Sequence, residues 1–233
     1  MALQSSGAIA LSDIQTEFGG VNPISMSEYY RGGAYTTTNN TNVPTAGVIS
    51  VGNFYGAQNS IEMTYEIIGA GGEGGGGSYG GTGASGGSSS FSGTNFTTVT
   101  SAGGAGGISQ GYYTGQAGAA SYYGVGGDGG LNSDSGNQSP GFPAPSTSYG
   151  AGGGGGGSAP FAANNGGGGG DAATRQTGTV NAIPGTTISI TIGAGGAAIG
   201  GGGDGAGGYA KFVVGGQTFE YTTAGSHSFT VPS

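Results

Sequence analysis

Apolar and polar residues alternate over several short stretches of the chain, as they do in a strand with one buried face. Glycine closely bounds each stretch, which favours strand ends there. A further stretch at 217–221 follows the last one after Gly215 and Gly216, which is the two-residue spacing of a tight hairpin. His227 lies in an alternating stretch near the C-terminus and is expected on a strand surface. The predicted strands are 61–68, 94–100, 186–192 and 209–214.

A different pattern recurs three times within the first 60 residues, at 9–14, 24–29 and 49–54. Each copy begins with isoleucine, ends with a bulky side chain and is followed closely by glycine. It predicts a short extended piece that leads into one or two helical turns. Ser12 is the expected N-cap of the first copy, with Gln15 at the position of a capping box and glycine at 19 or 20 to end the turn.

The second copy offers two N-caps, Ser25 and Ser27, with Glu28 in capping-box position for the former, and Gly32 as its expected end. The three copies together supply enough aliphatic and aromatic side chains for one small core cluster. A region of about 60 residues with so few large apolar groups is marginal on its own, so we expect it to pack on a neighbour.

The glycine content changes this picture. Of 233 residues, 62 are glycine and 8 are proline, while only three are leucine, which excludes a helical bundle or an α/β sandwich. Only 8 of the glycines precede residue 66, so we divide the chain into domains 1–60 and 61–233. The glycines of the second domain form blocks at 69–77, 80–87, 103–107, 124–130, 150–157, 166–170 and 193–208.

A glycine block is expensive to order, because glycine loses more conformational entropy than any other residue. A glycine helix of the polyproline-II type has three residues per turn and directs all its N–H and C=O groups outward. Such helices satisfy one another when they pack side by side, and only glycine allows that approach. The sequence therefore predicts a mostly irregular and β fold: a small N-terminal domain with short helices, then a glycine-rich domain of packed polyglycine-II helices with short strands and hairpins.

Charge and composition exclude several functions. Eleven acidic residues against three basic ones give a formal net charge of −8, which disfavours nucleic-acid binding. The chain has no cysteine, so it offers no disulfide, thiolate or cysteine-bound metal. It shows neither a signal peptide nor a run of about 18 apolar residues. We expect synthesis without a cleaved signal, and no membrane insertion.

No catalytic or cofactor site emerges from the motifs. Residues 69–74 match the dinucleotide fingerprint, but the glycines that follow are not expected to form the helix that binds a pyrophosphate. Glu62 and Glu66 lie about 13 Å apart on one strand face, too far for a glycosidase pair. A single histidine leaves no triad or zinc cluster. Four acids of the glycine blocks lack the register of calcium repeats and are expected to keep the surface soluble: Glu73, Asp128, Asp171 and Asp204.

Aromatic residues stand among serine, glycine and asparagine between the glycine blocks. This is the composition of binding loops, because tyrosine gives a large contact area at low entropic cost; the alternative is that the rings cover the edges of the glycine helices. The blocks at 103–107 and 124–130 are expected to place the tyrosine pairs 112–113 and 122–123 at one end of adjacent helices. The candidate binding residues are Tyr112, Tyr113, Tyr122, Tyr123, Phe142, Tyr149 and Phe161.

Residues 9–20 (IALSDIQTEFGG), 22–33 (NPISMSEYYRGG) and 53–56 (NFYG) resemble a segment common in structural proteins of tailed phages. The glycine blocks resemble the glycine-rich domain of phage tail-fibre adhesins, including the receptor-binding tip proteins of T-even-like phages. In that family, glycine helices pack as a polyglycine-II sandwich with variable loops at the distal end. The first 60 residues depart from the attachment domain of those tip proteins.

The resemblance implies a non-enzymatic virion protein without cofactors: a tail-fibre or tail-tip adhesin whose second domain binds a host surface protein or glycan. The first domain then attaches to other tail or fibre proteins, and homo-oligomerisation stays open. The candidate attachment residues are Ile14, Phe18, Tyr29, Tyr30, Phe54 and Tyr55.

Other functional classes remain open. One is a structural tail or capsid-decoration protein without receptor contact. Another is an ice-binding polyglycine bundle, which needs a regular face of threonine or alanine, whereas threonines 36–38 and 97–98 are local clusters. A glycan-cleaving depolymerase ranks last because it lacks an acid pair.

Overall fold

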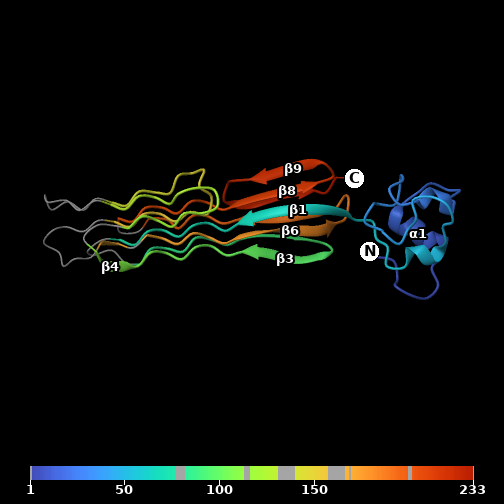
Figure 1. Ribbon diagram of the computed structural model, residues 1–233, viewed down its shortest axis with the longest axis horizontal. Helices are drawn as coiled ribbons and strands as arrows, with labels where there is room; N and C mark the ends of the chain where they lie inside the picture. Colours follow the sequence, from blue (N-terminus) through green and yellow to red (C-terminus); the bar gives the residue numbers. More distant parts are fainter. Residues whose placement is uncertain are drawn as a thin grey trace.

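The computed structural model describes residues 2–76, 82–112, 116–130, 140–156, 166–167, 169–198 and 201–232. Figure 1 shows an elongated molecule: the N-terminal module, residues 2–60, lies at one end, two β-sheets follow, and glycine-rich segments extend from the strands to the opposite end. The predicted mostly β and irregular architecture is confirmed, and the helical turns of the described residues all belong to the N-terminal module. Within that part of the chain no helix is long and apolar enough to cross a bilayer.

The three sequence copies of the N-terminal module form three helical turns, as predicted. They are the α-helix α1 (Leu11–Phe18) and the 3-10 helices η1 (Met26–Tyr29) and η2 (Val51–Phe54). The second and third are shorter than the first. The last residue of the repeated pattern is fully buried in every copy, so the three turns share one core around Ile14, Tyr29 and Phe54.

One half of a capping box begins each turn: the N-cap backbone N–H donates to a side chain three residues later. The predicted cap Ser25 is confirmed, whereas Ser12 is wrong as a cap, because α1 begins at Leu11 and Ala10 occupies the cap position. Gly19 ends α1 with φ of 82°, but η1 stops at Tyr29, before Gly32. The bonds run from Ala10 to Asp13 Oδ2 (2.8 Å), Ser25 to Glu28 Oε1 (3.1 Å) and Ser50 to Asn53 Oδ1 (2.8 Å).

Hydrogen bonds also join the three copies into a closed ring. The donors occupy one equivalent position, directly after the buried residue, and each acceptor lies two residues before the isoleucine of the next copy. The last bond returns from the third copy to the first, so the module has pseudo-threefold cyclic order. The bonds run from Gln15 Nε2 to Asn22 Oδ1 (3.2 Å), from the Tyr30 hydroxyl to the carbonyl of Gly47, and from the Tyr55 hydroxyl to the carbonyl of Gly7 (2.6 Å).

Two four-stranded antiparallel sheets follow the module, with strand orders β6-β1-β8-β9 and β10-β7-β2-β3. The predicted strands 61–68 and 209–214 are confirmed as β1 and β8, and the other two are confirmed within two residues at either end. The strands are β1 (Ile61–Ile68), β2 (Ser89–Gly93), β3 (Phe96–Ser101), β6 (Arg175–Ala182), β7 (Thr187–Ile192), β8 (Tyr209–Val214), β9 (Gln217–Tyr221) and β10 (Gly225–Thr230). A separate two-stranded pair consists of β4 (Ser109–Tyr112) and β5 (Gly166–Gly167).

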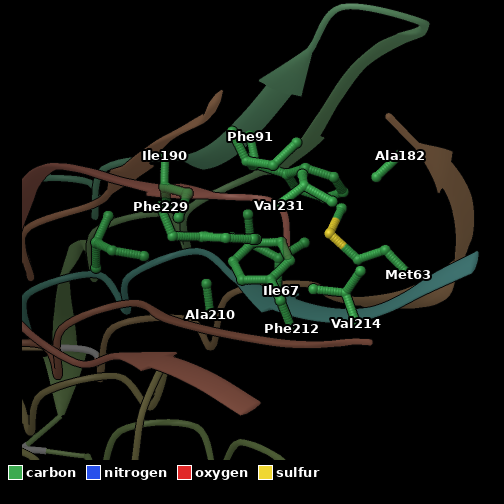
Figure 2. Close-up of a cluster of buried hydrophobic side chains, with 12 residues drawn as sticks. Met63, Ile67, Phe91, Ala182, Ile190, Ala210, Phe212, Val214, Phe229 and Val231 are labelled. Carbon is green, nitrogen blue, oxygen red and sulfur yellow. The ribbon is translucent and has the colours of Figure 1, made fainter. Parts of the chain in front are cut away.

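The inner faces of the two four-stranded sheets form one hydrophobic core (Figure 2). In β7 every second residue is buried, which is the period of two that its sequence predicts. Phe91 of β2 meets Phe212 of β8 edge to face, with ring centroids 5.0 Å apart. The β8–β9 hairpin turns through Gly215 and Gly216 with φ of 55° and 73°, and two positive φ angles are what a type I′ turn requires.

Apart from β5, the described glycine-rich segments form neither α-helix nor sheet, and their backbone groups bond from segment to segment. Segment 69–76 has six neighbouring segments. Its N–H groups donate to three of them in rotation, so that Ala70 and Glu73 both reach segment 82–88, at 2.9 Å. Its carbonyl groups accept from the other three. The N–H groups of segment 69–76 donate to segments 82–88, 169–174 and 201–208. Its carbonyl groups accept from segments 102–108, 150–156 and 193–198.

Segment 150–156 is surrounded in the same way by six segments, so the expectation that its amides bond to neighbours is confirmed. At these contacts no side chain fits. A Cβ on Gly71 would lie 1.9 Å from the carbonyl oxygen of Ala151, and one on Gly154 would lie 1.9 Å from that of Asp128. Such distances require backbone to move, which explains the glycine content of the blocks.

Glu73 contradicts the expectation that the acids of the glycine blocks lie on the surface. Its side chain is fully buried among the segments, and its Oε2 accepts from the backbone N–H of Ala84 at 2.7 Å. Glu73 lies three residues after the buried Ala70, so both side chains point to the same side of segment 69–76. On this side the packing leaves space for side chains, whereas a Cβ on the glycines of the segment would collide with backbone. Asp128, Asp171 and Asp204 are exposed, as expected.

Candidate functional site

Tyr112 lies at the opposite end of the glycine region from Tyr122 and Tyr123, so the prediction that these tyrosines share one end is wrong. Tyr112 belongs to β4, which pairs with β5 at the end remote from the sheets (Figure 1). Tyr122 and Tyr123 lie in a turn beside the start of β8. In the stretch between Tyr112 and Tyr122, the backbone N–H groups of Gln116 and Ala119 donate to segment 166–170, so 116–119 is one more packed segment and not a turn.

Tyr113 and Phe161 lie outside the described residues. The backbone of Tyr112 is described as part of β4. Of the candidate binding residues whose side chains are described, Tyr122 and Phe142 are the most exposed, at 68% and 54%. Tyr123 and Tyr149 are half-buried, because both rings pack against Tyr209, the first residue of β8.

Three tyrosines form a packed cluster where the glycine segments meet the sheet. The ring of Tyr209 lies 4.9 Å from that of Tyr149, stacked upon it, and 5.0 Å from that of Tyr123. The Tyr209 hydroxyl donates to Glu220 Oε1 of β9 at 2.9 Å. Burial, then hydrogen bonds with Tyr123 and Glu220, raise the pKa of Tyr209. This cluster therefore holds two turns of the glycine region onto β8 and keeps the Tyr209 hydroxyl protonated.

Arg175, the first residue of β6, joins Tyr122 to the same sheet. Its guanidinium carbon lies 3.9 Å from the centroid of the Tyr122 ring, within range of a cation–π interaction. Its Nε donates to Glu66 Oε1 of β1 at 2.5 Å, and this hydrogen bond raises the pKa of Arg175. Sequence reasoning flagged neither Arg175 nor Tyr209. The residues beside them in β6 and β8 do not indicate that Arg175 and Tyr209 contact tyrosines of distant turns.

The candidate attachment residues mostly build the N-terminal module. Four of them have buried side chains: Ile14, Phe18, Tyr29 and Phe54. The hydroxyls of the other two, Tyr30 and Tyr55, close the ring. A buried side chain supports attachment only by holding the module together, so a contact surface must come from exposed residues. Val21 and Val48 are the most exposed large apolar side chains of the module, at 81% and 92%.

Among the described residues, no three His, Asp or Glu side chains gather as metal ligands. His227 lies on β10 and is half-buried, with its Nε2 2.7 Å from the carbonyl oxygen of Thr223 and its ring 5.1 Å from that of Tyr221. Glu66 is held by Arg175, as described above.

No protein-family model matches the chain, no curated protein is significantly similar to it, and no solved structure is significantly similar to it in fold. Its function is therefore inferred from its own residues and their arrangement.

Proposed function

We propose that this chain is a tail-fibre or tail-tip adhesin of a tailed phage, which binds a host surface protein or glycan during adsorption. One observation carries the proposal: the N-terminal module and the free ends of the glycine segments lie at opposite ends of an elongated molecule (Figure 1). This separation suits a protein that is attached to the virion at one end and contacts the host at the other. The phage-like motifs at 9–20 and 22–33 add support.

The glycine segments are, in this proposal, polyglycine-II helices. Their donors rotate among three neighbours with a period of three residues, and each central segment has six neighbours. Both properties are those expected of packed helices with three residues per turn. Backbone dihedral angles measured by NMR over 69–76 and 150–156 test this, with φ expected near about −75° and ψ near about +145°. Values near those of β-strands would contradict it.

Rigid packing explains how such a protein binds. Residues fixed by six neighbours lose little further entropy on contact with a receptor, so more of the interaction energy appears as affinity. Copies on several fibres add avidity to weak single contacts. Tyr122 and Phe142 are the described candidates for ring contacts, because each exposes more than half of its side chain.

A competition experiment tests the proposal with the full chain. Purified protein is added to host cells before infection by a phage that carries the chain, and we expect slower adsorption. Gold-labelled antibody is expected to mark the tail of the virion. Labelling of the tail without competition would favour a structural tail protein, and labelling of the head would favour a decoration protein.

The Tyr122→Ser, Phe142→Ser double variant should keep its melting temperature and compete about tenfold less well if these rings bind the receptor.

One observation favours a second function, ice binding. The outer face of the sheet β10-β7-β2-β3 is a regular array of hydroxyl side chains with no charged residue. Its spacings are about 4.8 Å between strands and about 6.8 Å along each strand. Inhibition of ice recrystallisation by the purified chain would support this function, and no inhibition would exclude it. The rows are Ser226, Thr191, Ser90 and Thr100, then Ser228, Ser189 and Ser92, then Thr230 and Thr187.

A further inference from the structure

Segment 201–208 lies at the edge of the glycine packing and leaves one of its sides open. Gly203 and Ala206 donate to segment 150–156, and Gly205 and Gly208 donate to segment 193–198. Between them, the amides of Asp204 and Gly207 make no hydrogen bond within the described residues. In this segment, N–H groups three residues apart donate to the same neighbour. Asp204 and Gly207 are also three residues apart, so their N–H groups point to one side.

A groove of about 560 Å³ lies on this open side. Its floor is 204–207 and one wall is 143–146, the neighbour whose Ala144 N–H donates to the carbonyl of Asp204 at 2.9 Å. Tyr149 and Thr222 complete the lining. Pro143, Ala144 and Pro145 make this wall largely apolar and poor in donors.

The groove leaves space beside Gly207 that Gly203 and Gly205 of the same segment lack. A Cβ on Gly203 or Gly205 would lie 2.0 or 2.1 Å from a carbonyl oxygen of the adjacent segment, whereas a Cβ on Gly207 would meet nothing within 4 Å. A chain seated there would lie beside segment 201–208 as its other neighbours do. Because the site is open to solvent on its outer side, the occupant need not be glycine.

We propose that this groove binds a proline-rich polypeptide segment of another protein, in an extended conformation with three residues per turn. Carbonyl oxygens of such a segment repeat at every third residue on one side, which matches the free amides of Asp204 and Gly207. The proline and tyrosine walls suit a proline-rich chain, as in other grooves that bind this conformation. A glycan is less well matched, because one face of the Tyr149 ring is already stacked on Tyr209 and Asp204 Oδ1 accepts from the N–H of Ala198.

The probe is a proline decapeptide, which adopts this helix in water and carries carbonyl acceptors but no backbone donors. It is titrated into the isotope-labelled full chain and followed by amide NMR. We expect the resonances of Asp204 and Gly207 to shift and their hydrogen exchange to slow, while amides of 69–76 stay unchanged. Absence of shifts at millimolar peptide, or shifts confined to other residues, overturns the proposal.

Variants separate the groove from the rest of the molecule. Gly207→Leu should fill the groove and weaken peptide binding by at least about tenfold, with the melting temperature kept because no atom occupies that space. Thr98→Leu places the same side chain on an exposed position of β3 and should bind as the unmodified chain does. Gly207→Ala serves if the leucine variant fails to fold. The proposal is overturned if Gly207→Leu binds the peptide as tightly as the unmodified chain does. It is overturned in favour of a glycan if maltohexaose shifts these resonances and the peptide does not. Shifts that depend on protein concentration without any ligand would overturn it in favour of a second copy of this chain. The inference does not depend on the proposed phage function.

Discussion

At the scale of single residues, the absence of a side chain has different meanings at different glycines. At Gly154 it allows a neighbouring carbonyl to approach, at Gly216 it permits a positive φ, and at Gly207 it faces open space. Composition shows that glycine matters but cannot separate these cases, because each depends on which segment lies alongside. For the same reason the sequence placed Glu73 on the surface, although the packing encloses it.

The contrast between two glycines gives the first prediction. Gly154→Val should lower the free energy of unfolding by about 3 kcal/mol or more, because its Cβ would collide with the backbone of Asp128. Gly207→Ala should leave stability unchanged or raise it by less than about 1 kcal/mol. Thermal unfolding followed by circular dichroism measures both. Equal melting temperatures for Gly154→Val and the unmodified chain would argue against close packing at this contact.

The second prediction concerns alkaline pH. Burial raises the pKa of Tyr209 above its usual 10.0, so the folded protein keeps a proton that the unfolded chain releases. The associated stability is present below pH 10.0 and is lost as the pH rises above it. We expect urea unfolding to show this decline, and a shallower decline in Tyr209→Phe. Tyr122→Phe, at the exposed ring of the same region, is the control. Parallel curves for all three proteins would show that Tyr209 does not carry the effect.

At the scale of elements, alternation in sequence predicted β1, β7 and β8 well, because each strand buries every second residue or nearly so. It missed β6, whose residues are mostly polar and exposed and which is a strand only because β1 pairs with it along eight residues. It also misplaced the tyrosine pairs, since a short segment looks like a turn unless its neighbours are known. The repeat predicted three helical turns, but their cyclic bonding depends on tertiary contacts.

The first turn supplies the third prediction. Asp13→Ala removes the acceptor for the Ala10 amide and should cost about 1 kcal/mol of stability. Ser12→Ala, at the position that sequence alone favours as a cap, should be nearly neutral, because the Ser12 side chain caps nothing in α1. Chemical denaturation of the full chain compares the two. A larger loss for Ser12→Ala would restore Ser12 as the cap.

At the scale of the whole molecule, a change in composition near residue 60 predicted the position at which the ring-shaped module gives way to β1. Within the described residues, a hydrogen bond from the side-chain amide of Asn39 to Oδ1 of Asn181 in β6, at 3.3 Å, joins the two parts. Sequence could place this boundary because glycine content differs on its two sides. It could not arrange the segments, because glycine carries no side chain that specifies a neighbour.

This arrangement gives the fourth prediction, which tests the division of labour in the proposed adhesin. A fragment of residues 61–233 should bind host cells but fail to assemble onto particles that lack the protein. Immunoblots of purified particles and of washed cells measure the two properties. Normal assembly of the fragment would show that residues 1–60 are not the attachment module, and the full chain assembled in parallel controls for particle quality.

The hydrogen bonds of the glycine segments lie across the long axis of the molecule, and this has a mechanical consequence. A load applied between the N-terminal module and the far end runs along the segments and acts on the bonds between them in shear. Segment 69–76 is tied to six others, so it cannot slide until many bonds break together. The strands of the two four-stranded sheets continue directly into the glycine segments, so the sheets and the glycine region are joined without a flexible linker. The molecule should therefore transmit tension as a stiff rod and yield first where the module meets the sheets, at the contact of Asn39 with Asn181.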